Sequence, residues 1–382
     1  MRVIGDRTRR QFLTETTALA GAIGALCPRS SRGQSAPTSA DVHRLPRLDL
    51  MKFRHADGSV RPVTSTVDWQ RRRADIVRGM QSVMGPLPAP LPVRRAPPAF
   101  DVLDEVDAGS YVRRSIVYAV DAGPRTPAFL LVPKRVLGGR SRARGILCLH
   151  PTDDVIGAGV AVGLGGRANR AYAAELAERG FVTLVPSYPL LADYQPDVLS
   201  LGYASGTMKA VWDNIRGLDL LESLPFVEAA SFGAIGHSLG GHNAVYTAVF
   251  DDRIGVIASS CGLDLFVDYY GGRPDVWQRE KGWCQVRYMP RLLAYAGRLD
   301  DIPFDFAELV GALAPRVCFI SAPTRDSNFR WESVARIVAA ARPVYALHEA
   351  PDHLVVEHPD AGHDFPLPMR EKAYDLFSQH LG

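Results

Sequence analysis

The chain has few cysteines, and none of them forms a recognisable redox or zinc motif. It holds five cysteines in 382 residues, with no CxxC and no His/Cys cluster at zinc-binding spacing. Cys148, Cys261 and Cys318 fall in or beside expected core strands, where cysteine packs as a small apolar side chain. Free thiols are expected, with a Cys261–Cys284 bridge as the alternative. Walker and Rossmann glycine patterns are also missing, so we expect neither a metal nor a cofactor.

Neither positive nor negative charge predominates strongly in the chain. The chain has 44 Lys and Arg against 41 Asp and Glu, a formal net charge of +3. Residues 1–36 carry six arginines and two acidic residues, which leaves a net charge of −1 for the remainder. No basic patch is interleaved with aromatic residues, so we expect no nucleic-acid partner.

The amino-terminal region lacks a hydrophobic run long enough to anchor the protein in a membrane. Residues 12–27 are only modestly apolar and are interrupted by Glu15 and several threonines. A stable bilayer span needs a longer and more apolar segment. The preceding Arg9 and Arg10 lie in the sequence TRRQFLT, which resembles the twin-arginine export signal.

We therefore expect residues 1–36 to direct export, and the mature protein to be periplasmic or secreted. Cleavage is expected between Cys27 and Ala40, for example after Ala36, in a stretch rich in Ser, Gly and Pro. Lipidation at Cys27 is the less favoured alternative, because the bulky Leu26 stands where a small residue is usual.

The sequence GHSLG at residues 236–240 carries the strongest indication of chemistry. It joins a short apolar segment, 231–235, to the helical pattern of 241–250. A serine between glycines at a strand-to-helix turn is a nucleophile elbow, in which Ser238 has strained backbone angles and an exposed hydroxyl. We expect Ser238 to be a nucleophile.

A nucleophilic serine needs a base, and His363 is the expected one. Residues 353–358 read as a late strand, and His363 lies in the loop that follows, after Gly362 and before a final helix at 367–380. This position agrees with the chain order Ser, acid, His that such an elbow uses.

Asp326 is the expected acid that orients His363. The apolar run 317–320 reads as the strand before the histidine strand, and the loop after it contains Asp326 as its one carboxylate. Asp264, just past the strand that ends at Ser260, is the competing candidate. An Asx-turn role is the structural alternative for Asp326.

Two backbone amides should stabilise the oxyanion of the intermediate. Leu239 follows the nucleophile and opens the helix, so its N–H is the first donor. The second should come from the loop after the strand 145–149. Pro151 has no N–H, which leaves Thr152 or Asp153.

Ser238, Asp326 and His363 in this order, with the turn at 150–152, resemble the α/β-hydrolase superfamily. Within it the chain is similar to bacterial dienelactone-hydrolase-like and acetyl-xylan-esterase-like serine esterases, over residues 100–382. The resemblance implies an α/β-hydrolase fold and these three catalytic roles. True dienelactone hydrolases use a cysteine nucleophile, so the likeness concerns the fold and not their activity.

Strands and helices alternate from residue 145 onward, which predicts a mostly parallel, doubly wound sheet. Three segments before it, 102–106, 111–120 and 128–132, predict an antiparallel meander at one edge. Residues 37–99 form a Pro- and Arg-rich extension with one amphipathic helix at 69–84. One α/β-hydrolase domain is therefore expected over 100–382.

An aromatic-rich insertion at 262–303 breaks the alternation, on the side where the serine should open. We interpret it as a cap and expect one or two of Tyr270, Trp277 and Trp283 to face the cleft and bind substrate. The alternative is that these rings pack the insertion onto the main domain.

The sequence thus predicts an exported serine carboxylic-ester hydrolase that acts on a carbohydrate-linked ester of the acetyl type. A small-molecule or xenobiotic esterase fits the same residues. A peptidase of the prolyl-oligopeptidase type is less favoured, because the chain has no propeller-sized amino-terminal domain. The oligomeric state is not predicted.

Overall fold

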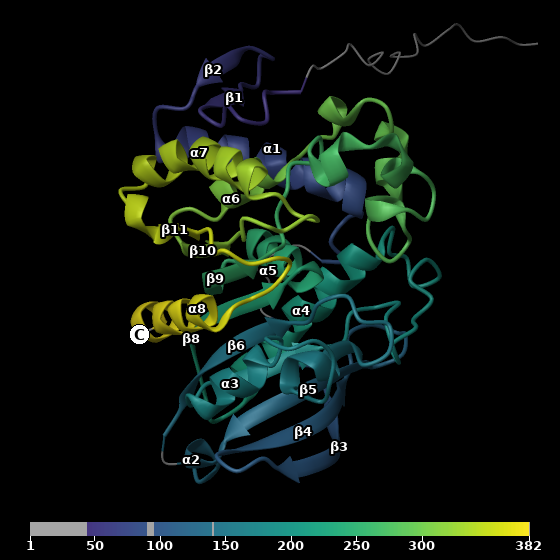
Figure 1. The fold of residues 1–382 in the computed structure, drawn as a ribbon, viewed down its shortest axis with the longest axis vertical. Coiled ribbons are helices and arrows are strands. Elements are labelled where there is room, and N and C mark those ends of the chain that lie inside the picture. Colours follow the sequence, from purple (N-terminus) through teal and green to yellow (C-terminus); the bar gives the residue numbers. More distant parts are fainter. Residues whose placement is uncertain (1–43, 90–94, 140, 382) are drawn as a thin grey trace, which may run out of the picture. The chain divides into compact units, whose positions relative to one another are not determined.

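The computed structural model describes residues 44–89, 95–139 and 141–381 (Figure 1). The expected export signal, its cleavage region and Cys27 lie outside these residues. No helix in the described ranges is long and apolar enough to cross a membrane.

A nine-stranded sheet with the order β11-β10-β9-β8-β6-β7-β5-β4-β3 organises the fold. The strands from β6 to β11 pair in parallel, whereas β3, β4 and β5 form an antiparallel meander that joins the sheet through β7. The predicted parallel sheet with an antiparallel edge is confirmed. The strands are β3 (Phe100–Asp107), β4 (Tyr111–Tyr118), β5 (Thr126–Pro133), β6 (Ala143–Leu149), β7 (Val182–Pro186), β8 (Val227–His237), β9 (Ile254–Ser260), β10 (Val317–Ser321) and β11 (Leu354–Glu357).

Helices cover both faces of the sheet because the central strands are apolar on both sides. Ile146 and Cys148 of β6 pack with α3 (Tyr172–Glu178) and α8 (Leu367–His380) in one cluster. The alternate residues, Leu147 and Leu149, belong to the other cluster. That cluster includes α4 (Gly206–Ser223), α5 (Leu239–Phe250), α6 (Phe306–Ala312) and α7 (Trp331–Leu347). The remaining short elements are α2 (Lys134–Leu137) and 3-10 helices at Gly157–Val162 and Pro351–His353.

The described part of the amino-terminal extension packs onto this core. It has a small hairpin, β1 (Lys52–Arg54) with β2 (Val60–Pro62), followed by α1 (Thr66–Met84). Ser65 caps α1 by accepting a bond from the Asp68 amide. The buried Arg72 of α1 forms an ion pair with Glu308 of α6, 2.5 Å away.

The insertion leaves the sheet after β9 and consists of short 3-10 helices, coloured green in Figure 1. Its apolar side chains share the larger core cluster, and Trp277 and Trp283 are 2% and 4% exposed. The 3-10 helices are Tyr269–Gly272, Pro274–Trp277, Gly282–Cys284, Pro290–Tyr295 and Leu299–Asp301.

Candidate functional site

Ser238 occupies a sharp turn between β8 and α5. Its φ of 54° and ψ of −120° are unusual for a residue with a side chain and cost free energy that the surrounding structure must offset. A Cβ on Gly236 would lie 2.2 Å from the backbone of Gly240, and one on Gly240 would lie 1.8 Å from the Leu149 carbonyl oxygen. Both glycines are therefore sterically required.

Backbone hydrogen bonds hold this turn in place. The Ser238 amide donates to the Ser260 carbonyl of β9 at 2.8 Å, and the Gly241 amide donates to the Ser238 carbonyl at 2.9 Å. Leu239 is the first residue of α5, so its N–H belongs to the positive end of the helix dipole. The predicted elbow geometry is present.

His363 and Asp326 are brought together from the loops after β11 and β10. His363 Nδ1 lies 2.8 Å from Asp326 Oδ2. The other carboxylate oxygen of Asp326 accepts the amides of Asn328 and Phe329 at 2.8 and 3.1 Å. Asp326 is thus also an Asx-turn residue, as the structural alternative predicted, and its role as the catalytic acid stays a prediction.

Asp326 is held in its ionised form. Burial raises the pKa of its carboxyl, but the hydrogen bond with His363 and the two amide bonds outweigh burial and lower that pKa below its ordinary value. An ionised carboxylate can only accept, so His363 Nδ1 must carry the proton between them. The Nε2 atom of His363 is then free to act as a base.

Ring contacts connect the base with the elbow. The rings of His237 and His363 are 4.8 Å apart between centroids, and Phe329 stacks on His363 at 5.9 Å. Since His237 immediately precedes Ser238, the elbow and the base share the carboxyl edge of the parallel strands.

Asp264 is buried elsewhere. It lies beside Ser333 and Arg330 at the start of α7, and His363 Nδ1 donates to Asp326 instead. Burial raises the pKa of Asp264 to about 7, although Ser333 and Arg330 oppose this shift.

Arg170 anchors the histidine loop, and sequence reasoning missed it. Its guanidinium donates to the His363 carbonyl at 3.1 Å and to Asp364 Oδ1 at 2.5 Å. Asn169 donates to the other oxygen of Asp364 at 2.8 Å. No local sequence pattern relates Arg170 to a loop almost 200 residues away.

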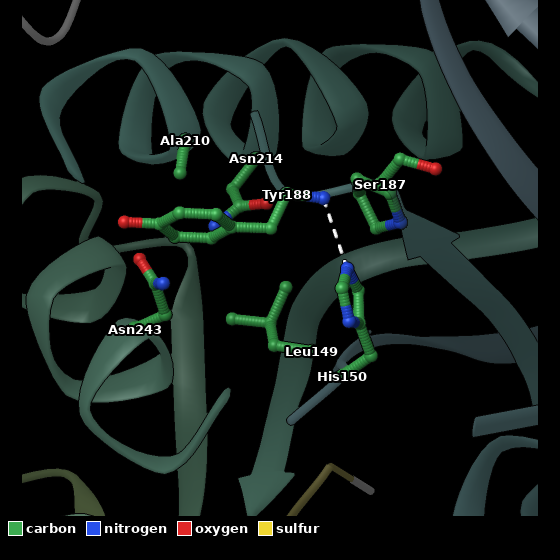
Figure 2. Close-up of a pocket in the computed structure, with 8 residues that line it drawn as sticks. Leu149, His150, Ser187, Tyr188, Ala210, Asn214 and Asn243 are labelled. Atoms are coloured by element: carbon green, nitrogen blue, oxygen red, sulfur yellow. Dashed lines mark hydrogen bonds between the residues drawn. The ribbon is translucent and has the colours of Figure 1, made fainter. Parts of the chain in front are cut away.

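The expected oxyanion loop is braced by His150. The Tyr188 amide donates to His150 Nε2 at 2.9 Å (Figure 2). Both residues line a cavity of about 10 Å³. Burial lowers the pKa of His150 to about 4, so the ring is neutral and its Nδ1–H donates to the Pro151 carbonyl at 2.8 Å.

The side chains of Thr152 and Asp153 are held at the same loop. Thr152 Oγ1 lies 3.2 Å from the Tyr288 hydroxyl of the insertion. Asp153 Oδ1 accepts the amides of Val155 and Ile156. These contacts fix the path of the loop. They do not distinguish the Thr152 amide from the Asp153 amide, so the second oxyanion donor stays a prediction.

The aromatic residues of the insertion divide into buried and exposed ones. Trp277 and Trp283 are buried, and Trp283 packs against His242 at 4.7 Å, so Tyr270 is the exposed one of the three residues of which one or two were expected to face the cleft. Both belong to the larger core cluster, and Trp283 also lies 6.1 Å from Phe306 of α6, so the two tryptophans pack the insertion onto the main domain, as the alternative interpretation describes. Tyr270 is 40% exposed and contacts Tyr269 at 4.7 Å.

Sequence comparison finds similarity to one family model and to one curated protein. Residues 200–348, which include the elbow and Asp326 but not His363, match the family model for fungal glucuronyl esterase. YtaP of Bacillus subtilis (strain 168), provisionally named a hydrolase, is 27% identical over 171 residues. That match covers 45% of this chain and 53% of YtaP, so the chain spans about half the length of this curated relative.

Solved structures share the fold at low sequence identity. A glucuronoyl esterase from Solibacter usitatus has a TM-score of 0.70 at 18% identity, over 88% of this chain and 98% of that one. A protein of Bacteroides fragilis NCTC 9343, provisionally named an acetyl xylan esterase, has a TM-score of 0.57 at 17% identity, over 77% and 76%. The chain therefore has an α/β-hydrolase fold, and the proteins that it resembles are named as hydrolases and esterases.

Proposed function

We propose that this protein is a serine carboxylic-ester hydrolase that uses Ser238, His363 and Asp326. The observation that carries the proposal is the strained elbow at Ser238 beside a histidine whose Nδ1 is bonded to a buried carboxylate. Gly236 and Gly240 permit the close backbone approach that this turn needs. Strained backbone of this kind clusters at active sites, so the angles of Ser238 support a functional role.

In the first half of the reaction, the Ser238 hydroxyl attacks the ester carbonyl carbon while His363 Nε2 takes its proton. Asp326 holds the ring in the correct tautomer and stabilises the imidazolium. The N–H of Leu239 and that of Thr152 or Asp153 stabilise the oxyanion. His363 then gives its proton to the leaving alcohol, and the acyl group stays on Ser238.

In the second half, water replaces the alcohol. His363 removes a proton from the water as it attacks the acyl-enzyme, and then returns that proton to the Ser238 oxygen. The products are the free acid and the regenerated serine. No step needs a cofactor.

The substrate that we propose is a carbohydrate-linked ester. The name of the matching family model and that of the Solibacter usitatus structure favour a glucuronoyl ester, ahead of the acetyl ester expected from the sequence. The acetyl group stays the alternative acyl group, as the Bacteroides fragilis name suggests.

An aromatic path supports a sugar or aryl group beside the base. Phe329 stacks on His363, Tyr269 lies 5.9 Å from Phe329, and the exposed Tyr270 lies against Tyr269. Aromatic faces of this kind bind the apolar faces of rings. In place of Trp277 and Trp283, we propose Tyr270 with Tyr269 as the platform.

One set of assays tests both the reaction and the substrate. We expect hydrolysis of a benzyl or methyl glucuronate ester, and labelling of Ser238 by a fluorophosphonate. Ser238→Ala should abolish labelling and lower kcat by about 10³-fold or more. Hydrolysis of p-nitrophenyl acetate without hydrolysis of any carbohydrate ester would point to a small-ester hydrolase. Residual labelling of Ser238→Ala would contradict the assigned nucleophile.

Export through the twin-arginine pathway belongs to this proposal as well. Its support is the TRRQFLT sequence before a short, weakly apolar segment. Replacement of both Arg9 and Arg10 by lysine should keep the protein in the cytoplasm, as cell fractionation would show.

A further inference from the structure

Three side chains of types that can bind metals, one of them the proposed base His363, converge from three different strand ends. His237 ends β8, Cys261 follows β9, and His363 lies in the loop after β11. One potential ligand atom from each of the three lies within 4.8 Å of the other two. They are spread over more than 120 residues, so no spacing pattern in the sequence could reveal them.

His237 has capacity for a further ligand. It is 1% exposed, and its Nδ1 lies 3.1 Å from Ser260 Oγ. Its Nε2 is buried and has no hydrogen-bond partner in the described part of the chain. A buried polar atom without a partner is uncommon and calls for a reason, such as an ion or a water that occupies the site.

Cys261 is held toward this position by its backbone. Its φ of 49° is in the left-handed region, which is unfavourable for a residue with a Cβ. The Cys261 amide donates to the Ser321 carbonyl at 2.9 Å, and its thiol lies 3.2 Å from the Asp364 carbonyl. The thiol is thus fixed beside the histidine loop.

We propose that His237, Cys261 and His363 form a binding site for a thiophilic divalent cation such as Zn²⁺, and that the bound cation inhibits the enzyme. One thiolate and two imidazoles are a ligand set that Zn²⁺ favours, with solvent as a fourth ligand. Bond lengths of 2.0–2.3 Å place ligand atoms about 3.5 Å apart in a tetrahedral site. The three side chains therefore need to close by about 1 Å.

Binding exchanges protons in a balanced way. The Cys261 thiol releases its proton to solvent and becomes the thiolate ligand, and the histidines bind through unprotonated ring nitrogens. No oxidant or reductant takes part. The His363 side chain is 23% exposed, so the cation can enter from the active-site side.

Inhibition follows from the identity of one ligand, and this part rests on the proposed function. If Nδ1 of His363 binds the cation, it can no longer pair with Asp326. If Nε2 binds the cation, it can no longer take the proton from Ser238. The cation would act as a reversible inhibitor, released by a chelator.

Zn²⁺ titration of esterase activity tests this site, with EDTA reversal as the first check. Cys261→Ser should raise the half-inhibitory Zn²⁺ concentration by at least about 10-fold, because a serine hydroxyl is a much weaker ligand. Cys284→Ser, at another buried cysteine, is the matched control and should leave that concentration unchanged. Equal inhibition of the wild type and Cys261→Ser would overturn the proposal.

Spectroscopy separates the site from catalysis. Co²⁺ added to the wild type should give a thiolate-to-metal charge-transfer band that Cys261→Ser lacks and that His237→Gln weakens. This readout needs no activity, so it tests the site even if every ester assay fails. Absence of the band in the wild type, or its persistence in Cys261→Ser, would show that these residues do not bind the metal.

Discussion

At the scale of single residues, the chemical role of a carboxylate depends on what it faces. Asp326 accepts from His363 and two amides, and its pKa is lowered although burial opposes this. Asp264 is equally buried, but burial raises its pKa to about 7. The two side chains differ in surroundings and not in chemistry.

We therefore expect the two Asp→Asn substitutions to differ strongly in activity. Asp326→Asn should lower kcat by about 10³- to 10⁴-fold, because the amide favours the wrong tautomer of His363. Asp264→Asn should keep kcat within a few-fold of the wild type. Steady-state kinetics on p-nitrophenyl acetate would measure both, and the reverse ranking would make Asp264 the catalytic acid.

At the scale of elements, the loop after β11 depends on the segment that leads into α3. Arg170 donates both to the His363 carbonyl and to Asp364, and Asn169 completes the contact. Asp364 has a lowered pKa: burial raises it, but the bonds from Arg170 and Asn169 outweigh that effect. The segment before α3 thus positions His363 through its loop.

Arg170→Lys should lower kcat by about 10- to 100-fold, with little change in KM. Lysine keeps the charge but cannot reach both acceptors with a planar fork, and a small displacement of the base is costly for the rate. Arg179→Lys, on a side chain that lies over Tyr374 at the other end of α3, is the control. A loss of thermal stability in Arg170→Lys with unchanged kcat would limit Arg170 to a structural role.

At the scale of the whole molecule, the same Asp264 contributes to the pH dependence of folding. Its pKa is about 7 in the folded protein and near 3.8 when unfolded. The unfolded chain therefore loses the proton first as pH rises, and stability falls between about pH 4 and pH 7. Above pH 7 both states are ionised and the loss is complete.

Asp264→Asn removes the ionisable group and with it the loss of stability above pH 4. The free energy of unfolding of the variant should therefore exceed that of the wild type by about 2–4 kcal/mol at pH 8. The difference should shrink as pH falls toward 4. Urea unfolding at several pH values would measure it, with Asp104→Asn on the exposed strand β3 as the control. A difference that does not change with pH would contradict the raised pKa of Asp264.

Much of the fold and the elbow could be predicted from the sequence, because these features obey local rules. The G-x-S-x-G sequence meets its steric requirement within five residues, and apolar periodicity identifies strands and helices a few turns at a time. The same reasoning placed Asp326 and His363 in loops at the ends of neighbouring strands. Their hydrogen bond agrees with that expectation.

Only the tertiary structure decided the contacts between segments that are far apart in the chain. The order of β8, β9, β10 and β11 in the sheet brings His237, Cys261 and His363 together, and the path before α3 brings Arg170 to the histidine loop. The tertiary structure also decided which aromatic side chains of the insertion are buried. Composition marks the insertion as aromatic, but whether a ring packs inward, as in Trp277 and Trp283, or stays exposed, as in Tyr270, depends on the surfaces that fold against it.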